Sequence, residues 1–314
     1  MRTSPGVHRC APRCARSSSP RSSLPSPTAS GRRWECTPAP EVQPSGLFEV
    51  LAEIETSPPR CVLEEEYGAA LRLDSDRVAV NFVSTIDGIV SFGKDTDESR
   101  AVGGGIAADR TLMAMLRSVA GVIVVGVGTL RATTNHQWTP RALAPERAAD
   151  MDALRAAAGL PADPAPLLVV SGSNVLPRDA EAVGRPAVPL HVLSADGVLP
   201  AAEALARTGA PTSAAPVSAA AVVEAARQLS EGGPVLCEGG PHLFGTLLDG
   251  RVPIDLFLTV APQLAGRSNH SAERRSLVEG VALPSFTRRG TLRSVRRADN
   301  HLLLRYRIDA AGNA

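Results

Sequence analysis

Three short polar stretches could carry chemistry, because each follows directly on an apolar run that is typical of a buried β-strand. They are Ser84-Thr85-Ile86-Asp87-Gly88, Gly126-Val127-Gly128-Thr129 and Glu238-Gly239-Gly240-Pro241. Ligands of open α/β sheets bind at the carboxyl ends of the strands, where such residues would meet. Together they supply hydroxyls, one isolated carboxylate and glycines that let a backbone approach a ligand closely.

Glu238 is the best single candidate for a ligand contact, because a carboxylate at the end of a core strand is costly unless it has a partner. Gly239 and Gly240 free the backbone for close contact, and Pro241 suits the first turn of a helix whose amides attract phosphate. That helix would carry His242, Leu243, Phe244, Gly245 and Thr246. We therefore expect the phosphates of a nucleotide at the glycine pair.

The middle stretch would place a flat ring beside those phosphates. Gly126 and Gly128 follow an apolar strand and let the backbone approach a planar or charged ligand, with Thr129 and Arg131 nearby. A short Gly-x-Gly is weak evidence by itself, because such turns are often purely structural.

Two interpretations fit the first stretch. Asp87-Gly88 is a turn pair, in which the carboxylate bonds nearby backbone and glycine takes a positive φ. A simple turn does not account for Asn81, Ser84 and Thr85, whose small polar side chains leave room for a ligand. A substrate site and a tight turn are therefore both open at this point.

The elements that must position these stretches alternate along the chain from residue 78. Expected strands cover 78–84, 122–127, 167–172, 190–194, 235–239 and 254–262, and expected helices cover 107–120, 145–158, 219–229 and 242–250. Two further strand-like pieces flank Ala298-Asp299-Asn300, which predicts a C-terminal antiparallel hairpin. The pattern predicts an α/β fold with a mixed, mostly parallel sheet covered on both faces.

The N-terminal region differs from the rest. Residues 1–45 are rich in Arg, Ser and Pro, which predicts a disordered tail in front of a single domain at 46–310. A short helix is expected at 46–54.

Composition argues against several classes of protein. The net charge of +1 over 314 residues and the acidic balance after residue 34 argue against a nucleic-acid partner. Five cysteines without paired spacing argue against zinc or any other metal site. No apolar run approaches the roughly 20 residues that cross a bilayer, so we expect a cytoplasmic protein with no membrane partner.

Three segments in this order and spacing resemble the reductase domain of riboflavin biosynthesis. They are NFVSTIDGIV (81–90), LRSVAGVIVVGVGTLRA (116–132) and VLCEGGPHLFGTLLDGRVPIDLFLTVAPQLAG (235–266), and the likeness covers about residues 75–308. The sequence looks closest to the stand-alone pyrimidine reductase branch. The resemblance implies a dihydrofolate-reductase-like three-layer fold, a homodimer, and NADPH-dependent reduction of a phosphorylated pyrimidine, 5-amino-6-(5-phosphoribosylamino)uracil.

The resemblance also implies roles for individual residues. Ser84, Thr129 and the Gly240–Thr246 segment should hold the cofactor, while Ser171 and Ser173 should meet its adenosine half. Arg117 and Glu238 should face the substrate, and Thr85 and Asp87 match the family's Ser/Thr-x-Asp-Gly. Arg131 is the residue that we expect to select a 2′-phosphate through bidentate contacts. The cations that could bind the substrate phosphate are Arg117, Arg131 and Arg141.

The chain departs from the family pattern at two positions. Ile89 stands where the family often has a lysine that could pair with the substrate, and Thr133 stands where an acid is expected near the nicotinamide. The alternatives are a reductase of pterins, dihydrofolate or another heterocycle, and a nucleotide-binding protein without turnover. His136 is interpreted as a surface histidine of a loop.

Overall fold

The apolar runs form the strands of a mixed sheet in a computed structural model that describes residues 46–54, 57–93, 98–172, 175–206, 216–267, 274–283 and 287–310. These residues belong to the unit that spans 44–314. The predicted tail at 1–45 and the candidate Ser173 lie outside the described residues.

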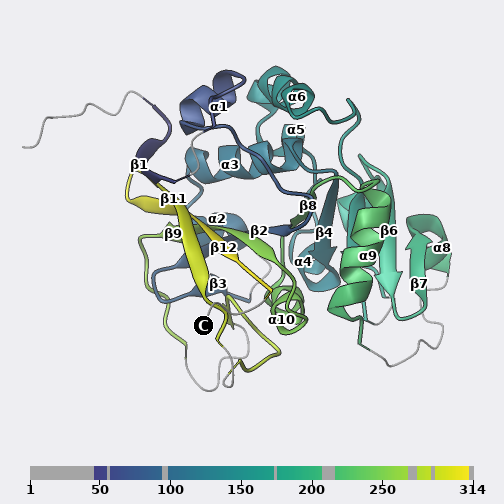
Figure 1. The fold of residues 1–314 in the computed structure, drawn as a ribbon. Coiled ribbons are helices and arrows are strands. Elements are labelled where there is room, and N and C mark those ends of the chain that lie inside the picture. The colour runs from purple at the N-terminus through teal and green to yellow at the C-terminus, as the bar shows by residue number, and fades with distance from the viewer. Residues whose placement is uncertain are drawn as a thin grey trace, which may run out of the picture. The chain divides into compact units, whose positions relative to one another are not determined.

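Ten strands in the described part of the chain form one sheet (Figure 1). Their order is β1 (Glu49–Glu53), β11 (Gly290–Ala298), β12 (His301–Ile308), β9 (Ile254–Ala261), β2 (Val78–Thr85), β8 (Val235–Cys237), β4 (Val122–Gly126), β5 (Leu167–Val170), β6 (Leu190–Ser194) and β7 (Gly197–Pro200). The six strands from β9 to β6 are parallel, and the remaining strands pair antiparallel with their neighbours. The predicted mostly parallel sheet and the C-terminal hairpin, β11–β12, are confirmed.

Helices cover both faces of this sheet, because successive strand residues point to opposite sides. One apolar core joins Ile123 and Val125 to α1 (Val62–Tyr67), α3 (Ala107–Ser118) and α6 (Ala148–Ala157). The other joins Val122 and Val124 to α9 (Ala219–Leu229) and α10 (Pro241–Asp249). Figure 1 shows α1, α3 and α6 together on one side of the sheet.

The remaining elements connect these layers. They are β3 (Ile89–Ser91), α2 (Glu98–Gly103), α4 (Val127–Ala132), α5 (Pro140–Leu143), the 3₁₀-helix η1 (Pro145–Arg147), α7 (Glu181–Gly184), α8 (Ala201–Ala206) and β10 (Arg275–Ser276). β3 and β10 pair antiparallel as a second, two-stranded sheet.

The short helix predicted at 46–54 is wrong, because this segment forms strand β1 along the edge of β11. Phe48 packs edge-on against Tyr67 with ring centroids 5.5 Å apart, and Glu53 forms an ion pair of 2.6 Å with the buried Arg296. Nine residues form at most a marginal helix in water, so these contacts and the pairing with β11 decide the conformation.

The length of β8 determines where a ligand can enter the sheet. β8 ends at Cys237, which pairs with Val80 of β2 and with Val124 of β4. β2 continues five residues farther, to Thr85, alongside β9. A gap therefore opens between β2 and β4 directly beyond the end of β8, a position that suits a ligand site in an α/β sheet.

No helix within the described ranges is long and apolar enough to cross a membrane.

Candidate functional site

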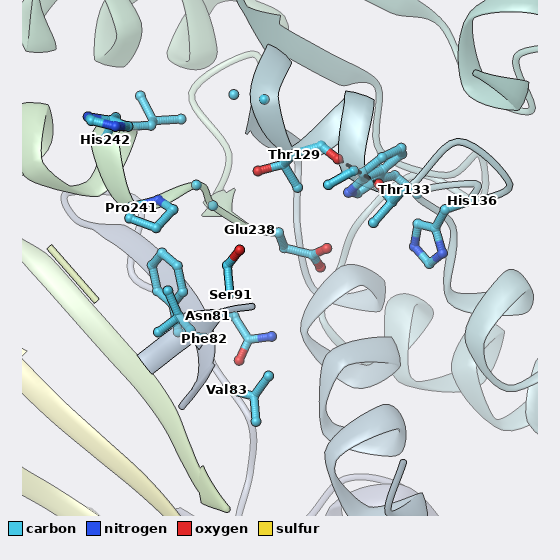
Figure 2. Close-up of a pocket in the computed structure, with 18 of the residues that line it drawn as sticks. Asn81, Phe82, Val83, Ser91, Thr129, Thr133, His136, Glu238, Pro241 and His242 are labelled. Atoms are coloured by element: carbon cyan, nitrogen blue, oxygen red, sulfur yellow. Dashed lines mark hydrogen bonds between the residues drawn. The ribbon is translucent and has the colours of Figure 1, made fainter. Parts of the chain in front are cut away.

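A cavity of about 870 Å³ occupies the gap beyond β8. Eleven of the candidate residues line it: Asn81, Arg117, Gly128, Thr129, Glu238, Gly239, Gly240, Pro241, His242, Leu243 and Thr246. Figure 2 shows Pro241 and His242 on one side, Thr129, Thr133 and His136 on the other, and Glu238 between them. Two of the three polar stretches, 126–129 and 238–241, thus converge at the edge where β8 ends, together with Asn81 from the middle of β2.

A buried ion pair forms part of the cavity wall. Arg117 donates from Nε to Glu238 Oε1 at 2.8 Å and from Nη2 to Glu238 Oε2 at 2.6 Å. The Arg117 side chain is 1% exposed and that of Glu238 6%. Arg117 is therefore the partner that the buried carboxylate of Glu238 requires. It lies on helix α3, 121 residues before Glu238 in the sequence.

The other side-chain donors of Arg117 contact other protein groups. Nη1 donates to the carbonyl oxygens of Gln137 and Thr139, at 3.1 and 3.2 Å, and Nη2 lies 2.9 Å from His136 Nε2. Arg117 lines the cavity as expected, but its charge is compensated by Glu238. This arrangement suits it to orient Glu238 rather than to bind a phosphate.

His136 lies in the cavity wall instead of on the open surface, so its interpretation as a surface histidine is wrong. Its ring packs edge-on against Trp138 with centroids 4.9 Å apart. Trp138 is buried and anchors the loop, which carries His136 to Arg117.

The two glycine turns contact each other through their backbones. The Gly126 amide donates to the Gly239 carbonyl at 2.8 Å, and a Cβ added to Gly240 would lie 3.1 Å from Thr129 Oγ1. Gly239 has φ of +102°, a conformation that side chains disfavour. These turns form a floor of exposed backbone beside Thr129.

Helix α10 begins at this floor. Gly240 is its N-cap and Pro241 its first residue, in the first turn as predicted. Both residues line the cavity, so the N-terminus of the helix, with its unpaired amides, lies at the cavity. Leu243 and Thr246 line the cavity with His242. Phe244 and Gly245 instead face the protein: Phe244 packs on Phe82, and a Cβ on Gly245 would lie 2.2 Å from the Glu279 carbonyl oxygen.

The middle of β2, rather than its tip, borders the cavity. Asn81, Phe82 and Val83 line it, whereas Ser84, Thr85 and Asp87 do not. In Figure 2 the Asn81 amide lies between Glu238 and Val83. The tip lies too far along β2, because β8 ends level with Val80.

Thr85 and Asp87 organise a turn. The Thr85 hydroxyl donates to Asp87 Oδ1, and the amides of Ala265 and Gly266 donate to the same carboxylate at 3.1 and 2.6 Å. The Thr85 hydroxyl, followed by these two amides, lowers the pKa of Asp87 to about 2. The structure thus favours the turn interpretation for Thr85 and Asp87.

The Asp87→Asn variant should lose stability at neutral pH and little at low pH. The lowered pKa means that the ionised carboxylate stabilises the folded chain above its unfolded pKa of about 3.9, and this stabilisation disappears as the pH falls through about 2. Urea unfolding of both proteins between pH 2 and 7 measures this. A difference between the proteins that does not shrink at low pH would contradict the assignment.

The residues expected at the adenosine half lie beside the cavity. Arg131 is exposed on α4 and donates from Nη2 to the Val175 carbonyl at 2.8 Å, without lining the cavity. Ser171 is fully buried, and its hydroxyl has no partner among the described residues. Its neighbour Gly172 does line the cavity.

Four charged residues line the cavity that the motif analysis did not assign: Arg100, Asp109, Arg110 and Arg275. Arg110 and Arg275 are exposed, and their side chains have no hydrogen bond or ion pair with the described residues. Arg275 pairs with Ser91 across β10 and β3, and Ser91 also lines the cavity. The adjacent charged residues at positions 109 and 110, in the first turn of α3, were the available signal.

Asp109 is buried, with 6% of its surface exposed. Burial raises the pKa of its carboxyl, while the neighbouring Thr259 hydroxyl and His301 act in the opposite direction. Burial likewise raises the pKa of the Cys237 thiol to about 12, as expected for an inert core cysteine.

No cluster of His, Cys, Asp or Glu within the described ranges could hold a metal ion.

Comparison with known proteins decides the family. The sequence profile described as RibD C-terminal domain matches residues 76–304. The chain belongs to this family. The RibD C-terminal domain family is the reductase family of riboflavin biosynthesis, so the resemblance noted from the three segments is confirmed. No curated protein sequence matches this member of the family.

Solved structures share its fold. A pyrimidine reductase-like protein from Corynebacterium diphtheriae has 20% sequence identity and a TM-score of 0.53, over 79% of this chain and 99% of that one. RibD from Acinetobacter baumannii has 15% identity and a TM-score of 0.52, over 74% of this chain and 58% of that one. This RibD-family chain therefore spans little more than half of the Acinetobacter protein. The predicted dihydrofolate-reductase-like fold is confirmed.

Proposed function

We propose that the protein is an NADPH-dependent reductase that converts 5-amino-6-(5-phosphoribosylamino)uracil to the ribitylamino product. The observation that carries the proposal is that one cavity is lined jointly by a glycine floor at a helix N-terminus and by the Arg117–Glu238 pair. The first feature suits a dinucleotide, and the second suits a polar heterocycle. Membership of a reductase family supports the combination.

The residues present fit a nicotinamide dinucleotide. Gly239 and Gly240 expose backbone, and the first amides of α10 favour the pyrophosphate through hydrogen bonds and the helix dipole. Thr129 and Thr246 add hydroxyls, and a Cβ on Gly128 would meet no atom within 4 Å, which leaves room for the ligand.

Selection of NADPH over NADH falls to Arg131 in this proposal. Its guanidinium is exposed and is held at one nitrogen by the Val175 carbonyl, close to the loop that follows β5 and carries Ser171 and Gly172. An arginine in this position suits a 2′-phosphate, because the planar guanidinium can bind two of its oxygens.

The substrate pyrimidine would contact Asn81 and Glu238, which both line the cavity (Figure 2). Its phosphate needs cations that the protein has not already paired. Arg110 and Arg275 meet this requirement, whereas Arg117 does not and Arg141 pairs with Asp152 on the exposed surface. We therefore assign the phosphate to Arg110 and Arg275.

A bound reduced nicotinamide supplies the hydride. The chain contributes orientation and exclusion of water: Thr129 and α10 fix one end of the cavity, and Asn81 and Glu238 fix the substrate ring. Thr133 lines the cavity where the family has an acid, and its hydroxyl donates to the Thr129 carbonyl at 2.8 Å. Thr133 thus supports α4 rather than acting as an acid.

The test is oxidation of NADPH, and separately of NADH, with three substrates: the phosphoribosylaminouracil, its dephosphorylated form and dihydrofolate. The proposal expects turnover of the first with NADPH preferred. The Arg110→Ala/Arg275→Ala double variant should raise KM about 10- to 100-fold for the phosphorylated substrate only, since each charged hydrogen bond is worth about 1.5–3 kcal/mol and these two are exposed to solvent. Arg141→Ala is the matched control and should change nothing.

Turnover of dihydrofolate alone would favour the heterocycle-reductase alternative. Binding of NADPH without oxidation on any substrate would favour a nucleotide-binding protein. A homodimer and a cytoplasmic location stay predictions, and sedimentation of the purified chain tests the first.

A further inference from the structure

The proposed reduction requires a proton as well as a hydride. The ring-opened substrate carries a C=N bond, and reduction adds a hydride to its carbon and a proton to its nitrogen. The following inference rests on the proposed function, because it asks which residue supplies that proton. A general acid must be protonated at working pH and must reach the cavity.

Four residues among those described both line the cavity and could carry a titratable proton: Asp109, His136, Glu238 and His242. Glu238 uses both of its carboxyl oxygens to accept hydrogen bonds from Arg117, so neither oxygen is positioned to donate to a ligand. His136 presents Nε2 to Arg117 Nη2 at 2.9 Å, so this nitrogen accepts and has no proton to give. His242 lies beyond Pro241, away from Asn81 and Glu238 (Figure 2).

Asp109 remains, and its position suits the role. It lies in the first turn of α3, eight residues before Arg117 on the same helix, and faces the same cavity. A Cβ built on Gly103 would lie 3.2 Å from Val83 Cγ2 and 3.7 Å from Asp109 Oδ2. The Asp109 carboxyl therefore lies close to Val83 of strand β2, the strand that also contains Asn81.

The surroundings of Asp109 favour a neutral carboxyl. Burial is the largest influence and raises its pKa, and the negative charge of Glu238 acts in the same direction. The Thr259 hydroxyl on β9 and His301 on β12 lower it. His301 also lies 3.0 Å, at Nε2, from the Gly103 carbonyl of α2. The other charged groups that line the cavity are Arg100 on α2, Arg110 and Arg117 on α3, and Arg275 on β10.

We propose that Asp109 is the catalytic acid that protonates the substrate nitrogen. The O–H bond of its carboxyl breaks, and the proton forms the new N–H bond as the C=N bond is reduced. The carboxylate that is left takes a proton from solvent through the cavity before the next turnover. The two electrons come from the reduced nicotinamide of the proposed reaction, so the step balances.

The Asp109→Asn variant should lower kcat/KM about 10²- to 10⁴-fold, the usual contribution of a general acid. Binding of NADPH, followed by its fluorescence, should stay within about twofold, because Asn keeps the size of the side chain. Wild-type kcat/KM should fall as the pH rises through the pKa of Asp109, and this falling limb should be missing from Asp109→Asn.

Two further variants separate catalysis from structure. Thr259→Val removes a hydroxyl that lowers the pKa of Asp109, so its falling limb should move to higher pH. The matched control is Thr111→Val. It removes a buried hydroxyl outside the cavity, on the helix that carries Asp109, and should leave the falling limb of the pH profile in place. A falling limb that survives in Asp109→Asn would overturn the proposal.

A readout without turnover completes the test. Infrared difference spectra of the protein alone, wild type minus Asp109→Asn at pH 7, should show the C=O stretch of a protonated carboxylic acid. A carboxylate band in its place would overturn the proposal whatever the substrate. If no substrate is turned over but the protonated band is present, the proposed function fails while the assignment of a neutral acid at Asp109 is supported.

Discussion

Replacing Glu238 with alanine is expected to lower the free energy of unfolding by about 3–5 kcal/mol and to abolish turnover. The change leaves the guanidinium of Arg117, which is 1% exposed, without its counter-charge. The two hydrogen bonds of 2.8 and 2.6 Å to the carboxylate are lost together. Since domains are stable by only about 5–15 kcal/mol, this is a large share of the total.

Urea unfolding measures the first effect, and steady-state kinetics on the surviving folded fraction measures the second. The matched control is Asp152→Ala, which removes the partner of Arg141 in an ion pair whose side chains are 70% and 69% exposed. That change should cost at most about 1 kcal/mol. Equal losses in the two variants would mean that the Arg117–Glu238 pair is not buried in solution.

A double variant separates the two roles of the pair. Arg117→Met/Glu238→Leu replaces both charges with apolar groups of similar volume, which is often neutral for stability. It should recover most of the stability that Glu238→Ala loses, yet remain inactive because the polar wall of the cavity is gone. Recovered activity would remove Glu238 from the proposed site.

The sheet was predictable from the sequence because its signal is local. Apolar strand runs bounded by glycines and helices mark β4, β6 and β9 to within one residue of their observed ends. Glu238 was also predictable, since a carboxylate at the end of a core strand requires a partner. The identity of that partner was not, because Arg117 reaches it from a different helix.

Which residues of β2 border the cavity depends on the lengths of β2 and β8 relative to each other, and neither segment shows this by itself. The tip of β2 lies outside the cavity because β8 is three residues long and β2 is eight. Strand length is set by where the neighbouring chain stops pairing, so Ser84 could not be separated from Asn81 by sequence alone. Asp109, Arg110 and Arg275 were missed for a related reason: they reach the cavity from helix α3 and the short strand β10, which lie outside the three motifs.

Substituting leucine for Gly128 should block the cofactor without unfolding the protein. Gly128 is the second residue of α4, lines the cavity, and has no atom within 4 Å of the position where a Cβ would stand. Leucine is a better helix former than glycine by up to about 1 kcal/mol, so the helix gains stability. Its branched side chain enters the space proposed for the dinucleotide.

We expect the affinity for NADPH, measured by fluorescence titration, to fall about 10- to 100-fold, because forcing extra methylene groups into occupied space costs about 1–3 kcal/mol. Gly128→Ala is the graded control: it adds one methyl group to open space, carries the same helix preference, and should change binding by less than about threefold. Thermal unfolding of both variants should occur at or above the wild-type temperature. If the leucine variant binds NADPH as tightly as the alanine variant does, the cofactor does not lie against α4. The assignment of the glycine floor to the dinucleotide then fails, while the stability effect of the Arg117–Glu238 pair is unaffected.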